Sequence, residues 1–191
     1  GMSSSAALEV ATAMTVRNLF PYTITDTAST IPPKPQRNGE LPPLSREEKI
    51  NLAKVCQRAE NEFVGVKCGI RDQISSLFGK AFHAIEIDCQ QLSVYHVPMI
   101  GEIAIVICNS GVKHALVGGE YNELRQRCEN AAQKLGVKSL RMADLKLLNA
   151  NKSKLSEREY QCAYHVVGEI QRVIFGAKAL REDDFVQFGQ Y

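Results

Sequence analysis

The opening of this sequence contains residues whose types and spacing suit the binding of a phosphate group. An alanine-rich stretch that ends near Leu19 predicts a helix, and a glycine and small polar residues lead into it: Gly1, Met2, Ser3, Ser4 and Ser5. The first N–H groups of a helix lack helical partners and lie at the positive end of its dipole, so they can bind an anion. The serine hydroxyls could cap this helix, or they could reach a metal ion bound to the phosphate.

A second candidate for chemistry is Asp72, which stands where a loop meets a helical pattern. Gly65 and Gly69 lie four residues apart in the apolar stretch before it. Such glycines indicate a loop whose backbone is held close to something. An aspartate at a helix start is favourable by itself. If Asp72 faced the anion site, its carboxylate could also orient an attacking hydroxyl or take its proton.

Five blocks of the sequence resemble the galactokinase family of the GHMP kinase superfamily. They occur in the order found in that family, and together they span nearly the whole chain: residues 1–9, 59–79, 109–116, 120–128 and 164–173. The resemblance implies an α+β fold and an ATP-dependent phosphorylation of galactose at its anomeric hydroxyl. The implied co-substrate and cofactor are ATP and Mg²⁺.

The resemblance also assigns roles to residues of the phosphate and metal sites. It makes residues 1–5 the segment that binds the nucleotide phosphates, and it makes Ser5 and Glu60 the magnesium ligands. A small cation between phosphates requires oxygen ligands and neutralises charge during phosphoryl transfer. Glu62 is a competing carboxylate, but on a continuing helix it would point elsewhere.

For the sugar site the resemblance points to three residues. Asp72 matches the proposed catalytic base of the family, which contacts the hydroxyl that accepts the phosphoryl group. Gly69 would lie against the sugar. Tyr121 would donate a hydrogen bond to the sugar, although a tyrosine packed at a helix start is the alternative. Arg71 stands where the family often has methionine. Because neighbouring side chains on a helix diverge, it need not neutralise Asp72.

Composition excludes several classes of function. The net charge of +2 comes from 23 basic and 21 acidic residues, so we expect neither nucleic acid nor a membrane surface as a partner. No apolar run approaches the length of a membrane span. The six cysteines form no Cys-x-x-Cys pair, which favours reduced thiols and a cytoplasmic protein.

Periodicity and turn residues predict the elements that position these residues. Residues 20–44 hold six of the seven prolines and should form a surface loop, either a tolerated insertion or a segment that binds a partner. A capping box at Ser45–Glu48 begins a helix that reaches about Asn61. Alternation and apolar runs predict three strands, and helical periodicity fills the remainder. The strands are expected at 81–89, 93–98 and 102–109, and the later helices at 121–135, 139–149 and 156–180.

These expectations combine into a partial GHMP kinase fold of class α+β. Residues 1–110 would form a partial N-terminal domain with helices on a mixed sheet, and residues 111–191 a partial, mostly helical C-terminal domain. The family has an arginine-bearing segment before the serine motif and a glycine-rich segment after position 191, so we expect the chain to be truncated at both ends. An exposed sheet edge would then favour self-association. The alternative to a sugar kinase is a non-catalytic fragment that at most binds nucleotide or self-associates.

Overall fold

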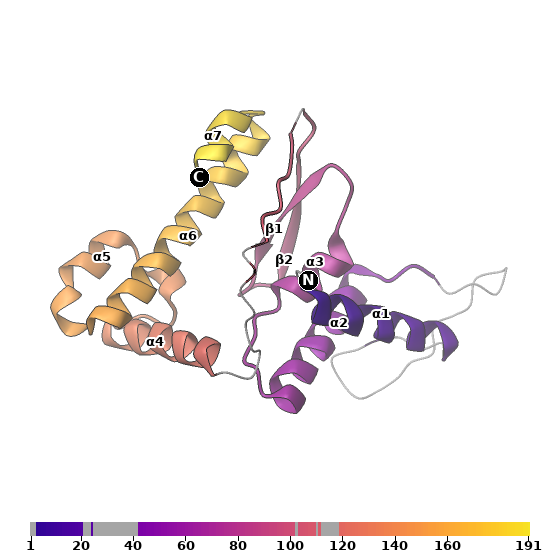
Figure 1. Ribbon diagram of the computed structural model, residues 1–191, viewed down its shortest axis with the longest axis horizontal. Helices are drawn as coiled ribbons and strands as arrows, with labels where there is room; N and C mark the ends of the chain where they lie inside the picture. Colours follow the sequence, from indigo (N-terminus) through magenta and orange to yellow (C-terminus); the bar gives the residue numbers. More distant parts are fainter. Residues whose placement is uncertain (1–2, 21–23, 25–41, 102, 110, 112–118) are drawn as a thin grey trace. The chain divides into compact units, whose positions relative to one another are not determined.

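The computed structural model describes residues 3–20, 24, 42–101, 103–109, 111 and 119–191 (Figure 1). Gly1 and Met2 of the expected phosphate segment lie outside the described residues, as does most of the proline-rich stretch. The chain divides into two compact units, Gly1–His96 and Val97–Tyr191. The sequence placed the domain boundary later, near residue 110, and the assignment of the parts to kinase domains stays a prediction.

Helices dominate both units. The first unit contains α1 (Ser4–Leu19), α2 (Arg46–Arg58), the π-helical segment η1 (Ala59–Val64), α3 (Arg71–Phe78), the strand β1 (His83–Asp88) and most of the strand β2 (Ser93–Pro98), which continues two residues past the boundary. The second unit contains α4 (Glu120–Lys134), the 3₁₀ turn η2 (Leu140–Met142), α5 (Leu145–Ala150), the 3₁₀ turn η3 (Lys152–Lys154), α6 (Glu157–Arg181) and α7 (Phe185–Gln190).

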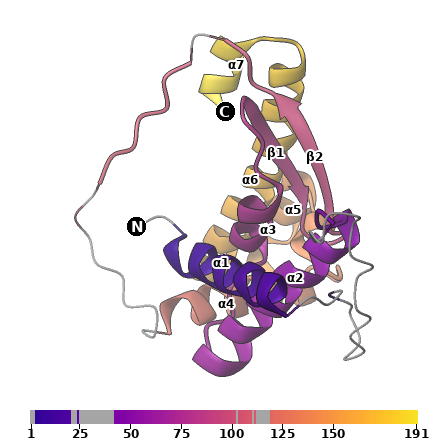
Figure 2. The same ribbon diagram turned by 90° about the vertical axis from the view of Figure 1, so that its right-hand side faces the viewer.

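In the first unit, α1, α2 and α3 pack against one another around an apolar core (Figure 2). Leu52 and Ala53 of α2 are fully buried, and so is Ile74 of α3. The expected capping box is present, because the Ser45 hydroxyl accepts a hydrogen bond from the Glu48 N–H while the Glu48 carboxylate accepts one from the Ser45 N–H. This arrangement satisfies two helix donors and fixes where α2 begins.

The strands are only partly as expected. The sheet in the described residues has two antiparallel strands, β1 and β2, at two of the three expected positions. The third expected strand, at 102–109, is wrong: residues 103–109 belong to no helix or strand, and Ile105, Val106 and Ile107 are 74%, 78% and 68% exposed. A strand needs a neighbour to pair its backbone groups. An apolar sequence at 103–109 does not by itself provide a neighbouring strand.

The second unit is helical, as expected, and α4 packs along α6. Its core contains Ala131, Leu148, Ala163 and Val167, all 0–1% exposed. The expected helix at 139–149 is instead the turn η2 followed by α5, and the Asp144 side chain caps α5 by accepting a hydrogen bond from the Leu147 N–H. The cap at Asp144 starts a separate helix inside the expected span, so the span consists of a turn and a short helix.

The α+β class expected from the sequence is confirmed, with a smaller sheet than expected in the part of the chain that the structure describes. Within that part, no helix is both long and apolar enough to cross a membrane.

Candidate active site

The serine segment begins α1 without capping it. Ser3 precedes the helix in the left-handed conformation, with φ 50° and ψ 33°, and its side chain makes no capping hydrogen bond. Ser3, Ser4 and Ser5 are all exposed. Since no acidic residue lies in the first turn either, the N–H groups at this helix start face no side-chain anion from that turn. This helix end is therefore suited to an anion supplied from outside.

The segment η1 separates the two glutamates that competed as metal ligands. Glu60 is buried, with 6% of its surface exposed. The side chain of Glu62 is 73% exposed and lies 3.9 Å from Arg58 Nε. Both glutamates lie in the π-helical segment at the end of α2, and such segments are frequent at functional sites. The structure thus directs Glu60, and not Glu62, into the interior of the unit.

Three side chains from three elements meet around Glu60. Glu9 of α1 lies close enough to Glu60 of η1 for their carboxyl groups to interact, and Gln73 of α3 donates from Nε2 to Glu9 Oε2 over 3.5 Å. Gln73 is 2% exposed, and its Oε1 is buried without a hydrogen-bond partner. Burial raises the pKa of Glu9, and the charge of Glu60 raises it further, while the Gln73 hydrogen bond lowers it. Three elements thus bring two carboxyl groups and a buried amide together.

Sequence reasoning missed Glu9 and Gln73. A signal was available for Glu9, because it follows Ser5 by four residues and therefore shares a face of α1 with it. Ser5 lies about 6 Å along the helix axis from Glu9. The helix thus places Ser5 one turn away from the contact between Glu9 and Glu60.

Asp72 stands beside Gln73 in the first turn of α3, and its side chain is 40% exposed. Arg71 Nε lies 3.3 Å from Asp72 Oδ1. Although neighbouring positions on a helix diverge, the long arginine side chain thus bends back to the carboxylate. Arg71 is 76% exposed, so this ion pair can open when another group approaches Asp72.

Two cysteine thiols lie near these carboxylates and stay protonated. Burial, together with the charge of Glu9, raises the pKa of Cys56 to about 11. Burial also raises the pKa of Cys68, and the charges of Glu60, Glu9 and Asp72 contribute. The charges of all three carboxylates therefore act on the Cys68 thiol, so Asp72 shares an electrostatic environment with the two glutamates.

The remaining sugar-site residues lie apart in the chain. Gly65 has φ +82°, a conformation that favours glycine, whereas a Cβ added to Gly69 would meet no atom within 4 Å. Gly69 thus borders open space before α3. Tyr121 lies in the first turn of α4 in the second unit and is 51% exposed. Its contact with a sugar stays a prediction.

The chemistry of Ser5 and Glu60 is compatible with a magnesium ion that is held mainly by phosphates. Within the part of the chain that the structure describes, no three His, Cys, Asp or Glu side chains cluster tightly enough to hold a metal. Mg²⁺ commonly binds one or two carboxylates plus substrate phosphates, so a complete protein cage is not required. The carboxylate of Glu60, the hydroxyl of Ser5 and the orphaned Oε1 of Gln73 are hard oxygen donors of the kind it prefers.

Comparison with known proteins relates the whole chain to galactokinases. The chain is 40% identical over 191 residues to the galactokinase of Bos taurus and 39% identical to that of Homo sapiens. The galactokinase of Actinobacillus pleuropneumoniae is 39% identical over 193 residues. Each alignment covers 100% of this chain but only 43–44% of the relative, so the chain spans less than half of the length of these relatives.

A solved structure shows the same relationship. The crystal structure of Lactococcus lactis galactokinase complexed with galactose matches 98% of this chain and 44% of that chain, with a TM-score of 0.73 and 25% identity. No family model matches the sequence.

Proposed function

We propose that this chain is part of a galactokinase-type kinase, which transfers the γ-phosphoryl group of Mg²⁺-bound ATP to the anomeric hydroxyl of galactose. One observation supports this most: α1, which begins at the exposed serines, packs against α3, which begins beside Asp72, and Gln73 of α3 donates a hydrogen bond to Glu9 of α1. Similarity to galactokinases over all 191 residues supports the same reaction.

In this proposal each element has one task. The N–H groups at the start of α1 bind the nucleotide phosphates, with residues 1–5 around them. Ser5 and Glu60 hold Mg²⁺, which, when bound, offsets negative charge on the phosphates. Asp72 accepts the proton of the attacking sugar hydroxyl. Gly69 leaves room for the sugar ring, and Tyr121 donates a hydrogen bond to it.

Arg71 contacts the proposed catalytic base, Asp72. Its guanidinium Nε lies 3.3 Å from Oδ1 of the Asp72 carboxylate, the group proposed to accept the proton. The sugar hydroxyl must approach the carboxylate oxygens, so the exposed Arg71 side chain has to share or leave them as galactose binds.

The test is formation of galactose 1-phosphate from Mg²⁺-ATP and galactose, compared between the 191-residue chain and Asp72→Asn. Loss of general-base assistance should lower the rate by at least about 100-fold while ATP affinity stays unchanged. Asp183→Asn is the matched control, because Asp183 is exposed in the second unit and its positive φ suits asparagine. Equal turnover by the Asp72 variant and the unmodified chain would refute the assignment of the base.

A second candidate function follows from the length of the alignment. Since the chain covers 43% of its relatives, it could bind Mg²⁺-ATP without completing phosphoryl transfer. ATP binding with no galactose 1-phosphate would support this non-catalytic candidate.

The proposal extends to partners and location. All six cysteines lie among the described residues and are free of disulfides, which is typical of a reducing cytoplasm. We expect no nucleic acid or membrane partner. We also expect copies of the chain to self-associate through the exposed apolar segment 103–107, because such a segment readily pairs with another chain.

A further inference from the structure

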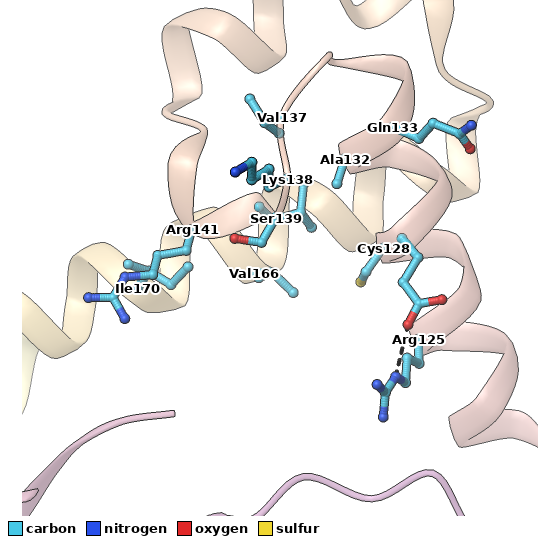
Figure 3. A pocket seen from close by; sticks show the side chains of 12 residues that line it. Arg125, Cys128, Ala132, Gln133, Val137, Lys138, Ser139, Arg141, Val166 and Ile170 are labelled. Carbon is cyan, nitrogen blue, oxygen red and sulfur yellow. Dashed lines mark hydrogen bonds and ion pairs between the residues drawn. The ribbon is translucent and has the colours of Figure 1, made fainter. Parts of the chain in front are cut away.

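The second unit contains a pocket that the proposed reaction does not use. It has a volume of about 640 Å³ and lies between α4, α6 and the segment that connects α4 to η2 (Figure 3). Small-molecule sites commonly have volumes of about 300–1,000 Å³. The pocket is therefore large enough for a small organic ligand.

Apolar groups form much of the pocket wall. Leu140 and Ala132 are buried there, and Val166 and Ile170 of α6 also line it. Cys128 faces the same space, and burial raises the pKa of its thiol, with smaller contributions from Cys162 and Glu129. The thiol is therefore neutral and adds no negative charge to the wall. Such a wall suits the apolar body of a ligand.

Charged groups at the same pocket are mostly cationic. Its lining includes the side chains of Arg125, Lys138 and Arg141, and Glu129 is the single carboxylate among its lining residues. Glu129 is already matched, because Arg125 Nε lies 3.0 Å from its Oε1. The net charge of the lining is therefore positive, and lysine and arginine are the usual partners of carboxylate and phosphate groups.

Ser139 supplies an unsatisfied polar atom at this pocket. Its hydroxyl is buried and has no hydrogen-bond partner. Ser139 occupies the N-cap position of η2, yet its side chain makes no capping hydrogen bond. Buried hydroxyls normally find partners, so an unpartnered one in a pocket wall indicates an acceptor or donor that comes from a ligand.

We propose that this pocket binds a small organic anion, a carboxylate or a phosphate ester attached to an apolar body. The apolar body lies against Leu140, Val166 and Ile170. The anionic group accepts hydrogen bonds from the Ser139 hydroxyl and from the Lys138 ammonium group. Because all of these residues belong to the second unit, this site is independent of the residues proposed to act in phosphoryl transfer.

The probe is 2-naphthyl phosphate, titrated into the ¹⁵N-labelled 191-residue chain and followed by amide chemical shifts. Saturable shifts should map to residues 128–141 and 166–170, with a Kd no weaker than about 1 mM. 2-Naphthoate tests the carboxylate class in the same way. 2-Naphthol and inorganic phosphate, which each lack one half of the ligand, should not saturate at that concentration.

Variants identify the polar partners. Ser139→Ala and Lys138→Gln should each weaken binding by roughly threefold or more, the effect of one hydrogen bond. Lys146→Gln, an exposed lysine of α5 outside the pocket, should leave the Kd unchanged. Amide dispersion verifies that each variant is folded. The proposal is overturned by shifts that map elsewhere, by no saturation with either anion, by equal binding of 2-naphthol, or by variants that bind as the unmodified chain does.

Discussion

Two ion pairs of similar chemistry differ in burial, and burial decides how much each matters to the fold. Arg17 Nη2 lies 3.3 Å from Glu48 Oε1, and the two side chains are 3% and 11% exposed. Arg58 and Glu62 form a pair at 3.9 Å, but their side chains are 65% and 73% exposed. A buried charge that loses its partner is costly, whereas an exposed one is solvated by water.

Glu48→Gln should therefore lower the free energy of unfolding by about 3 kcal/mol, because it leaves the Arg17 guanidinium buried and uncompensated. Glu62→Gln, the matched exposed change, should cost less than about 1 kcal/mol. Urea unfolding monitored by circular dichroism measures both values. Equal losses in the two variants would show that burial does not set the contribution of these ion pairs.

Helix starts distinguish structural serines from the serines proposed to bind phosphate. Ser45 and Ser156 each form a complete capping box. Ser3, at the start of α1, makes no side-chain capping bond. Among these three α-helix starts, the one that the proposal assigns to phosphate thus has a serine without a capping bond.

Ser45→Ala and Ser156→Ala should each lower stability by about 1 kcal/mol, since each removes a capping hydrogen bond. Ser3→Ala should change stability by less than about 0.5 kcal/mol. Thermal unfolding of the three variants compares them directly. A large loss in Ser3→Ala would assign that serine a structural role instead.

Helices α4 and α6 are joined by a pH-sensitive contact. Lys134 Nζ lies 2.7 Å from Glu159 Oε2, and hydrogen bonds from Lys134 and the Ser156 backbone lower the pKa of Glu159 from 4.5 to about 2. Because the native state holds this carboxylate ionised, the stabilisation is complete above about pH 4.5 and is lost as the pH falls toward 2.

Lys134→Met should consequently lower stability at about pH 7, and the difference from the parent should shrink as the pH falls toward 2, because Glu159 then becomes protonated in the parent as well. Urea unfolding across this range measures the difference between variant and parent. A difference that stays constant down to about pH 2 would show that Lys134 acts through packing and not through the charge of Glu159.

Short-range sequence signals predicted capping boxes and most helices. They could not predict contacts between residues that lie far apart in the sequence. The capping boxes at Ser45 and Ser156 marked helix starts correctly because all their partners lie within three residues. The expected strand at 102–109 was wrong because pairing depends on a neighbouring strand that periodicity cannot reveal. Gln73 was missed because its contact with Glu9 arises only when α3 packs against α1.

At the scale of the whole molecule, exposed apolar segments predict association between copies. Ile105 is 74% exposed within the segment 103–107, which has no regular secondary structure. Burying that surface against a second chain would be favourable.

Sedimentation of the unmodified chain should therefore reveal species larger than the monomer, and Ile105→Glu should shift the distribution toward monomer. Val186→Glu is the control, since Val186 is 77% exposed in α7, outside the segment. A purely monomeric parent, or an equal effect of the two variants, would contradict association through residues 103–107.

Glu60 is central to the proposed function, because it is assigned to hold the magnesium ion that accompanies ATP at the start of α1. Calorimetric titration of the 191-residue chain with ATP, with and without Mg²⁺, tests this assignment most directly when Glu60→Gln is compared with Glu62→Gln. We predict Mg²⁺-dependent ATP binding that weakens by at least about tenfold in Glu60→Gln and is unchanged in Glu62→Gln. ATP binding that is indifferent to Mg²⁺, absent from the parent chain, or equally affected in both variants would contradict the assignment.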